Sequence, residues 1–407
     1  MSDELLIIRN NGQILTVRTE DSHIVQIQAE NQEDKNILGN IYVGKVRNIV
    51  KNINAAFVEY NKGQMGYLPL DMKQCPVHTD GVPYQEGRVL IGDEIIVQVV
   101  REAIKTKPPA LSGSISLPGK YIVLVPDAYR TSVSSKIYDK DTRNQLSEII
   151  NSYVTESYGF IARTNSANAG TQDIINEIET LVKKYMDIVN FGRHKAALSC
   201  LYSAPPAYLK SIIDSYNHQL SKIITDDTRL YNNIKLFLEE KDASLIDKLV
   251  LWDSSNGKLD AVYNIPRTIE HALMPKVWLK SGAYIIIQPT EALVSIDVNT
   301  GKAVSKKKDV QKTFLKVNME AAKEIALQLR LRNLSGIIII DFIDMEKEED
   351  NQQLIECLRH ELAKDRVQTR FIGMTKLGLA EVTRKKAMKP LYMQLKGSST
   401  KQGMFEN

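Results

Sequence analysis

The sequence lacks the segments that would place a chain in a membrane or send it across one. Its first residues, MSDELLIIRNNGQ, contain neither a basic leader nor an apolar signal region, and no apolar run approaches the roughly 20 residues that span a bilayer. Cysteine is scarce: Cys75, Cys200 and Cys357 stand apart without the pair spacing of a metal site. This pattern suits a reducing compartment and supports neither a disulfide nor a structural zinc. We expect a soluble cytoplasmic protein.

Histidine is sparse as well, and the six histidines form no recognisable acid–base motif, although distant ones could still meet in the fold. The net charge of +4 says little about partners. Basic side chains are nevertheless concentrated in two segments, the first with Lys302, Lys306, Lys307, Lys308, Lys312 and Lys316, and the second with Lys376, Arg384, Lys385, Lys386 and Lys389. Such clusters could follow a polyanion or could be solvated surface.

What the sequence does contain is enough apolar material for several cores. A chain of 407 residues with 43% hydrophobic content is expected to form about two to four domains. Between residues 38 and 113, short β-branched or aromatic runs alternate with turns such as NKG, which predicts a small antiparallel barrel of the OB type. Such barrels bind single strands on exposed aromatics beside basic residues, here Phe57 and Tyr67 with Lys45 and Lys107. Phe57 could instead fill the barrel core.

The middle of the chain mixes strands and helices. GKYIVLVPDAYR predicts a strand, residues 141–156 a helix, and residues 171–224 amphipathic helices. The short strand in GFIARTNSANAG ends in Arg163 and Thr164 before a polar loop. That pattern could bind a phosphate, although a lone loop arginine is often structural. The amino-terminal strands lack a core of their own and are expected to pair with the mixed segment after residue 224.

The most informative segment begins at residue 276. GAYIIIQPTEALVSIDVNTGK predicts a hairpin that turns near Pro289, with Asp297 and Asn299 on one face of its second strand. GIIIIDFIDMEKEED predicts a buried strand that ends at Asp341, and a right-handed β-α-β crossover brings Asp341 to the same sheet edge as Asp297. The helix of this crossover carries one apolar stripe, made of Val310, Phe314, Val317, Ala321, Ile325 and Leu329.

Carboxylates at the end of a buried strand need a positive partner, because an uncompensated charge there is costly. Two carboxylates and a carboxamide, without cysteine or histidine nearby, favour Mg²⁺ or Mn²⁺ over Zn²⁺. Asp341 could instead cap the turn that follows it, but Asp344 suits the capping of the next helix better. The residues therefore predict a magnesium site held by Asp297 and Asp341 beside Asn299, with Asp344 in a supporting place.

The chain resembles the ribonuclease E/G family of endoribonucleases over nearly its whole length. The resemblance rests on motifs that occur in order: GNIYVGKVRNIV, AAFVEY, GYLPL, GFIART, SIDVNTGK, QLRLRNLSGIIIIDFIDM and TKLGLAEVTRKK. It implies a multidomain α+β fold. The implied parts are an RNase-H-like scaffold (1–37 with 206–275), an S1-type RNA-binding OB barrel (38–113), a 5′-monophosphate sensor region (114–205), a deoxyribonuclease-I-like catalytic α/β domain (276–395) and a tail (396–407).

The resemblance also implies roles for single residues. The family's metal-binding aspartates match Asp297 and Asp341, and its assisting asparagine matches Asn299. Its RNA-binding positions in the barrel match Phe57, Tyr67 and Lys107, and its 5′-phosphate sensor positions match Gly119, Val123, Arg163 and Thr164. The implied reaction is hydrolysis of single-stranded, A/U-rich RNA to products with a 5′-phosphate and a 3′-hydroxyl.

Two departures from the family pattern modify these expectations. Gln368 stands where the family can carry a further sensor arginine, so we expect weak sensing of the 5′ end. The segment up to Asn407 contains no Cys-x-x-Cys and is short and polar. Neither the family's zinc link nor its small dimerisation domain is therefore expected, and we predict a zinc-free monomer or at most a weak dimer.

Three hypotheses follow. The first is a magnesium-dependent endoribonuclease in RNA processing and decay, with single-stranded RNA as its partner. The second is a non-catalytic RNA-binding or ribosome-associated protein, against which the intact set of Asp297, Asn299 and Asp341 argues. The third is a structural scaffold in a larger assembly, which nothing in the sequence requires. Cleavage of a short RNA in the presence of Mg²⁺ separates the first two.

Overall fold

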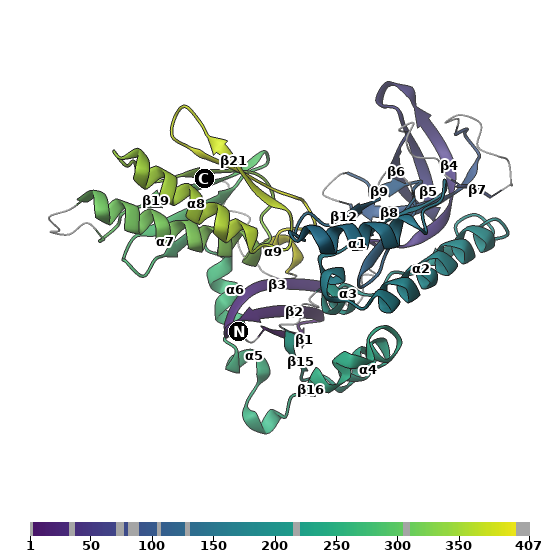
Figure 1. Cartoon of the computed structure of the whole chain (residues 1–407), viewed down its shortest axis with the longest axis horizontal. Helices are drawn as coiled ribbons and strands as arrows, with labels where there is room; N and C mark the ends of the chain where they lie inside the picture. The colour runs from purple at the N-terminus through teal and green to yellow at the C-terminus, as the bar shows by residue number, and fades with distance from the viewer. Residues whose placement is uncertain are drawn as a thin grey trace. The chain divides into compact units, whose positions relative to one another are not determined.

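The structure is a computed structural model of the 407-residue chain. It describes residues 3–31, 37–70, 77–79, 89–103, 107–126, 131–214, 220–303 and 310–395. The chain forms two compact units, one of residues 1–34 with 218–407 and the other of residues 35–217. The fold is mixed α/β (Figure 1). In the part of the chain described, no helix combines the length and apolarity needed to cross a membrane.

In the first unit, the amino-terminal strands are completed by strands from far along the chain. The sheet runs in the order β16 (Leu249–Leu251), β15 (Leu220–Thr225), β1 (Asp3–Asn10), β2 (Gln13–Glu20) and β3 (His23–Asn31). β1 pairs in parallel with residues 220–224 of β15, which precede the segment predicted as its partner. β16, from the predicted segment, joins this sheet only through β15. Residues 220–225 are a strand, so the prediction of helices up to residue 224 was wrong there. The run LSKIIT ends in buried β-branched residues, which pack well in a pleated sheet.

Short helices surround this sheet and complete its core. The helical elements are α4 (Thr228–Lys241), η4 (Ala243–Lys248), η5 (Ser254–Asn256), α5 (Leu259–Val262), α6 (Ile265–Leu273) and α9 (Leu391–Gln394). Asp227 is the N-cap residue of α4: its side chain accepts hydrogen bonds from the Arg229 and Leu230 N–H groups at 2.8 and 2.9 Å. Leu6 and Leu15 of the sheet share one buried cluster with Leu391 of α9.

The second unit contains a closed five-stranded barrel. Its strands are β4 (Ile41–Val50), β5 (Ala55–Asn61), β6 (Gln64–Pro69), β9 (Ala110–Ser112) and β8 (Glu94–Arg101), and β8 pairs back onto β4 to close the ring. The short elements η1 (Lys51–Ile53), β7 (Val77–His78) and β14 (Cys200–Tyr202) accompany it. Every described pairing around the ring is antiparallel except that of β6 with β9. The predicted OB-like barrel is confirmed.

The rest of the second unit is a four-stranded sheet covered by helices. The sheet runs β10 (Leu117–Pro118), β11 (Ile122–Val125), β13 (Gly159–Ala162) and β12 (Ser132–Val133). The helices are α1 (Lys140–Asn151), η3 (Thr164–Asn168), α2 (Thr171–Gly192) and α3 (Ala207–Asp214). Asp139 caps α1, which ends before the predicted residue 156. Phe160 is fully buried at the centre of this part.

The carboxy-terminal half of the first unit holds a six-stranded sheet. The order is β17 (Lys276–Trp278), β18 (Tyr284–Pro289), β19 (Leu293–Asn299), β20 (Gly336–Asp341), β22 (Ala380–Arg384) and β21 (Thr369–Met374). The hairpin β18–β19 turns after Pro289, as predicted, and α7 (Val310–Leu331) crosses over to the parallel strand β20. A second helix, α8 (Glu348–Ala363), lies beside α7 (Figure 1).

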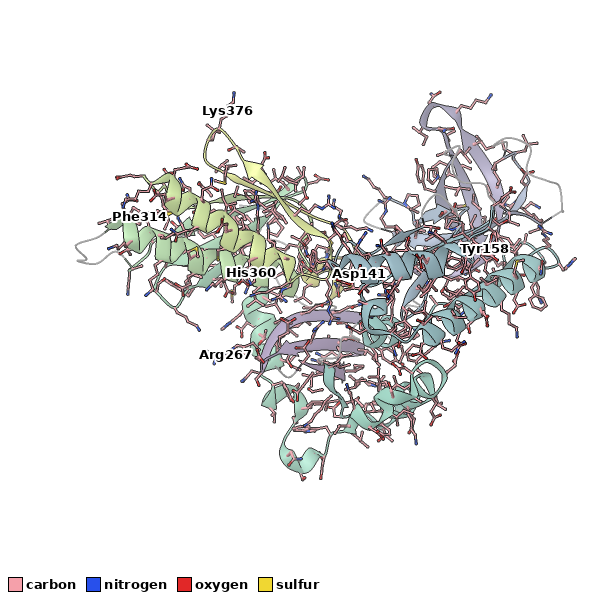
Figure 2. All side chains as sticks on the ribbon, viewed as in Figure 1. Asp141, Tyr158, Arg267, Phe314, His360 and Lys376 are labelled. Carbon is pink, nitrogen blue, oxygen red and sulfur yellow. The ribbon has the colours of Figure 1, made fainter. Side chains whose placement is uncertain are left out.

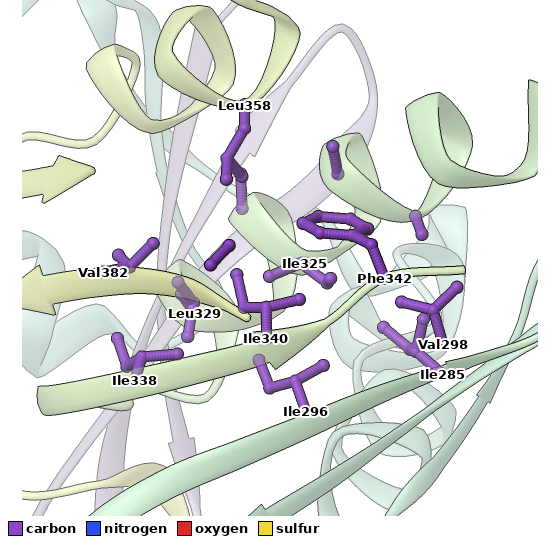
Figure 3. Packing of buried hydrophobic residues seen from close by; sticks show 14 of the residues in the cluster. Ile285, Ile296, Val298, Ile325, Leu329, Ile338, Ile340, Phe342, Leu358 and Val382 are labelled. Atoms are coloured by element: carbon purple, nitrogen blue, oxygen red, sulfur yellow. The ribbon is translucent and has the colours of Figure 1, made fainter. Parts of the chain in front are cut away.

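Both helices cover one face of this sheet. Figure 3 shows Ile325 and Leu329 of α7 and Leu358 of α8 packed against Ile338 and Ile340 of β20. Full burial of a side chain of this size stabilises a fold by about 1.5–3 kcal/mol. The predicted stripe on α7 is therefore confirmed from Val317 onward.

The first two members of that stripe do not belong to the core. Val310 is 42% exposed, and Phe314 near the start of α7 is only partly buried (Figure 2). Periodicity identifies the apolar face of a helix but not how far its partner surface extends, so the prediction was wrong at this end of the helix.

On the opposite face of the sheet, side chains of the described strands are exposed. Because strand side chains alternate, Ile338 and Ile340 face the helices while Ile337, 54% exposed, and Asp341 face the other way. The same alternation in β19 turns Val294, Ile296 and Val298 into the core and leaves Asp297 exposed. This uncovered surface, the open face, carries the predicted site residues of the sheet.

Candidate active site

Asp297 and Asp341 are brought together by strand register. They are directly paired residues of the parallel strands β19 and β20, and both are exposed on the open face. Neighbouring strands lie about 4.8 Å apart, so the two carboxylates leave adjacent backbone positions on the same side of the sheet. The predicted meeting of these residues at one sheet edge is confirmed.

Asn299 joins this pair from the end of β19. Its Nδ2 donates a hydrogen bond of 2.6 Å to Oδ2 of Asp297, two residues earlier on the same face. The chain then turns at Gly301, whose φ is +50° and where an added Cβ would lie 2.4 Å from the Gly282 carbonyl oxygen. Only glycine suits such a turn, which explains why NTG follows the aspartate in the sequence.

The electrostatics of the site favour a cation. Burial and the negative charges of Asp297 and Asp344 raise the pKa of the Asp341 carboxyl above its usual value. Within the ranges described, no group of three or more His, Cys, Asp or Glu side chains is arranged to hold a metal ion. Two carboxylates with a carboxamide nonetheless fit Mg²⁺, which is commonly bound through one or two carboxylates and keeps several waters.

Asn318 of α7 is a residue that sequence reasoning missed. It is fully buried, its Nδ2 donates to the Ile343 carbonyl oxygen at 2.8 Å, and its Oδ1 accepts from the Ile343 N–H at 3.0 Å. These two bonds fix the backbone immediately after Asp341. The one signal was a polar residue beside the apolar stripe of the helix.

Asp344 does not cap the next helix, so that prediction was wrong, while its supporting place beside Asp341 stays a prediction. The N-cap residue of α8 is Lys347, and its side chain makes no capping hydrogen bond. The first turn of the helix instead carries Glu348, Glu349 and Asp350. Acidic side chains at this position stabilise a helix because its N-terminus is the positive end of the helix dipole. Asp344 remains exposed, and its charge contributes to the raised pKa of Asp341.

In the barrel, the predicted aromatic pair lies on the outer surface. Phe57 of β5 and Tyr67 of β6 are cross-strand partners with ring centroids 6.2 Å apart and ring planes at 74°. Both are half-buried and neither belongs to the barrel core, which takes Ala56 and Val58 from the same strand. The alternative that Phe57 fills the core is wrong.

Two lysines of the barrel have different surroundings. The Tyr67 N–H donates to the Pro109 carbonyl oxygen at 2.8 Å, so the segment that contains exposed Lys107 runs beside the aromatic pair. Lys45 instead forms an ion pair with Glu94 at 3.6 Å. Lys107 is therefore the better placed of the two for a ligand on the rings.

The predicted sensor residues lie on or beside the neighbouring strands β11 and β13: Val123 is in β11, Gly119 precedes it, and Arg163 and Thr164 follow β13. Arg163 donates from Nη1 to the Gly119 carbonyl oxygen at 2.6 Å and from Nη2 to Asp214 Oδ1 at 2.5 Å. The Oγ1 of Thr164 lies 3.0 Å from the Ser134 hydroxyl, and Val123 pairs with Ile161 two residues before Arg163. The arginine thus combines a structural bond with an ion pair to an acidic neighbour.

Glu177 of α2 organises the loop beside Arg163 and was not found from the sequence. Its carboxylate accepts hydrogen bonds of 2.6, 2.7 and 2.8 Å from the N–H groups of residues 120, 121 and 122. An added Cβ at Gly119 would lie 2.6 Å from the carboxylate carbon of Glu177, so a larger residue there would have to displace this carboxylate. Burial raises the pKa of Glu177, while the three backbone donors and Arg163 act in the opposite direction.

Comparison with known proteins identifies the family. The model described as the ribonuclease E/G family matches residues 116–387. Ribonuclease G of Haemophilus influenzae is 33% identical over 398 residues, which cover 95% of this chain and 80% of the relative. The chain belongs to the ribonuclease E/G family. Ribonuclease G of Escherichia coli (strain K12) is 31% identical over 95% of this chain and 80% of its own length, and ribonuclease E of a Nostoc species is 32% identical over 95% and 56%.

Membership of the ribonuclease E/G family confirms the resemblance that the motifs indicated. Gln368 is exposed and lines a pocket with Arg370, Lys385 and Lys386. Arg384 of the same basic segment is only 4% exposed, and its Nε donates to Asp365 at 2.7 Å. It therefore supports the fold and does not belong to the basic surface suggested by the sequence.

Other basic and thiol residues of this family member are described only in part. Lys306, Lys307, Lys308 and Cys75 lie outside the described residues. Lys376 projects from the loop between β21 and β22 (Figure 2). The Cys200 side chain is exposed, and that of Cys357 is half-buried.

Proposed function

We propose that this chain is a metal-dependent endoribonuclease that hydrolyses single-stranded RNA in RNA processing and decay. The observation that carries the proposal is the register pairing of Asp297 with Asp341, joined by the hydrogen bond from Asn299. Relatives at 31–33% identity over 95% of the chain bear the names ribonuclease G and ribonuclease E, which supports the same activity here. The proposed products carry a 5′-phosphate and a 3′-hydroxyl.

In this proposal, each residue of the candidate active site has a separate role. Asp297 and Asp341 would hold Mg²⁺ or Mn²⁺, which when bound supplies Lewis-acid polarisation of the scissile phosphate and a more acidic attacking water. Asn299 orients the Asp297 carboxylate through its 2.6 Å hydrogen bond. Asn318 holds the backbone after Asp341 so that this carboxylate keeps its direction.

RNA binding is assigned to the barrel. A pair of half-buried aromatic rings on an outer surface offers π faces to unpaired bases, and base–aromatic stacking contributes about 1–3 kcal/mol per base. Phe57 and Tyr67 would stack bases, while Lys107 would contact the phosphate backbone. The same surface would serve the alternative, a non-catalytic RNA-binding protein, so binding alone does not distinguish the two functions.

Cleavage with matched charge variants tests the activity. A short A/U-rich RNA is incubated with Mg²⁺ and wild type, Asp297→Asn, Asp341→Asn or the control Glu349→Gln, which removes an acid from the first turn of α8. We expect both aspartate variants to lose cleavage by several orders of magnitude and to retain RNA affinity measured with EDTA, while the control cleaves normally. Wild-type turnover in either aspartate variant would show that the metal site is wrongly assigned. An inactive wild type that binds RNA would favour the binding protein.

Weak recognition of a 5′-monophosphate is the second part of the proposal. Gly119, Val123, Arg163 and Thr164 would form the pocket, but Arg163 already pairs with Asp214 and Gln368 adds no charge. We expect a 5′-monophosphate to speed cleavage only modestly relative to a 5′-hydroxyl. Equal rates on the two substrates in the wild type would refute the sensor without affecting the nuclease assignment.

A further inference from the structure

The edge strand of the six-stranded sheet carries an exposed aromatic pair that the proposed function does not use. Trp278 of β17 is 60% exposed, and Tyr284 of β18 is its cross-strand partner. Their ring centroids lie 5.3 Å apart with the planes at 63°. The ammonium group of Lys276 lies 4.0 Å from the centre of the tryptophan ring and 3.8 Å from that of the tyrosine. We call these three residues the aromatic platform.

Local structure fixes the platform on the open face. Val277, between its two β17 members, packs toward the helix-covered core, so Lys276 and Trp278 face the other way. The hairpin that joins β17 to β18 is closed by hydrogen bonds from the Leu279 N–H to the Ala283 carbonyl oxygen at 2.9 Å and from the Gly282 N–H to the Leu279 carbonyl oxygen at 3.0 Å. An exposed tryptophan on so short and well-bonded a hairpin is available to a ligand without rearrangement of the backbone.

Strand register places the platform in line with the candidate metal site. Tyr284 pairs with Asn299, so Trp278, Tyr284 and Asn299 form one row across three strands. The next row on this face is Lys276, Ile286, Asp297 and Asp341. Each strand spacing is about 4.8 Å, so the tryptophan backbone lies two spacings, about 10 Å, from that of Asn299. A nucleotide close to the scissile phosphate would lie over this part of the sheet.

We propose that Trp278, with Tyr284 and Lys276, is a stacking subsite for the base of a nucleotide that flanks the scissile phosphodiester. The position of this nucleotide next to the scissile phosphate rests on the proposed nuclease function, whereas the binding of RNA to Trp278 does not. The exposed tryptophan face accepts the base, and the lysine, held over the rings by cation–π attraction, contacts a neighbouring phosphate. Stacking of this kind tolerates any base, so the subsite positions the RNA strand and does not read its sequence.

Tryptophan fluorescence provides a binding assay that needs no catalysis. The chain has two tryptophans. Trp252 directly follows β16 of the other sheet of this unit, and its Nε1 donates to the Gly257 carbonyl oxygen at 2.9 Å. In a Trp252→Phe background, a short single-stranded RNA is titrated in EDTA. We expect strong quenching of the remaining Trp278 emission. Binding detected by anisotropy of a labelled RNA without any change in that emission would overturn the proposal.

Substitutions and base removal test the stacking itself. Trp278→Ala is expected to weaken RNA binding about 5- to 150-fold, whereas Trp278→Phe should stay within about threefold of wild type because it keeps a ring. RNAs with a single abasic nucleotide, moved along the strand, should bind the wild type more weakly wherever a base is stacked, by Phe57 and Tyr67 or by Trp278. The position stacked by Trp278 is the one where the loss depends on that residue. At that position the abasic RNAs should show no further loss with Trp278→Ala. Full additivity of the two losses at every position would refute direct stacking.

The role of Lys276 is tested by the salt dependence of RNA binding. Lys276→Met should lower the slope of log affinity against log salt by about 0.7, the value for one phosphate contact on a single strand. If Asp297→Asn abolishes cleavage while Trp278→Ala changes neither affinity nor kcat/KM, the subsite is wrong and the nuclease assignment stands. If RNA quenches Trp278 but the wild type never cleaves, the stacking surface stands and the proposed function fails.

Discussion

The buried Asn318 gives the sharpest test of how the structure holds its candidate active site. Replacement by alanine removes two hydrogen bonds to the Ile343 backbone, of 2.8 and 3.0 Å, and leaves the N–H and C=O groups of a partly buried residue without these partners. Each such group left unsatisfied costs about 1–3 kcal/mol. Because Ile343 retains some contact with solvent, we expect Asn318→Ala to lower the free energy of unfolding by about 2–4 kcal/mol.

Urea unfolding followed by circular dichroism measures this loss. The matched control is Val310→Ala on the same helix, which trims a side chain that is 42% exposed and should change stability by no more than about 0.5 kcal/mol. A second variant, Asn318→Asp, keeps the acceptor for the Ile343 N–H but places a carboxylate against the Ile343 carbonyl oxygen. Burial and this contact raise the pKa of the introduced carboxyl, so part of the lost stability should return as pH falls toward about 4 and the group can donate again.

The functional consequence separates a local effect from a general one. Because the loop after Asp341 is released, we expect Asn318→Ala to lower kcat more than it changes RNA affinity in EDTA. Stability equal to wild type would refute the hydrogen-bond reasoning. A loss of 2–4 kcal/mol with kcat unchanged at a temperature where the variant is folded would refute the link between Asn318 and the position of Asp341.

Three further contacts lead to predictions. Arg384→Met leaves Asp365 buried without the Nε donor at 2.7 Å and is expected to cost about 3–5 kcal/mol by urea unfolding; a loss below about 1 kcal/mol would contradict this. Asp214→Asn frees Arg163 from its ion pair and should raise the ratio of cleavage rates on 5′-monophosphate and 5′-hydroxyl RNA, whereas a lower ratio would count against the sensor assignment. Phe57→Ala should weaken RNA binding in EDTA about 5- to 150-fold, and unchanged affinity would remove the ring from the interface.

The arrangement of the candidate site could be predicted from local patterns. Alternation along SIDVN places Asp297 and Asn299 on one face, and the handedness of a β-α-β crossover sets both strand ends on one edge. These rules are short-range or topological and so can be applied to a sequence. They placed Asp297 and Asp341 at one sheet edge, whereas the register that pairs the two residues directly is seen only in the structure. The run IIIID suggested a strand buried on both faces, which was wrong because Ile337 is 54% exposed.

What the sequence did not indicate depends on contacts between distant residues. Asn318 bonds to Ile343, 25 positions later, and Glu177 bonds to the loop at residue 121, 56 positions earlier. No periodicity links such partners. The barrel shows the same limit, since whether Phe57 faced inward or outward depended on a register that the sequence left open.

The pairing of β1 with β15 has a consequence for biosynthesis. Strands β1 to β3 end at Asn31, but their parallel partner starts at Leu220, after the whole of the second unit. At roughly 5–20 residues per second, a ribosome needs about 10–40 s to make the intervening chain. During that interval the hairpins of β1 to β3 exist without their neighbour, while residues 35–217 emerge with all the partners of their own sheets. The inserted unit can therefore fold first, although the strands that precede it are the first to be made.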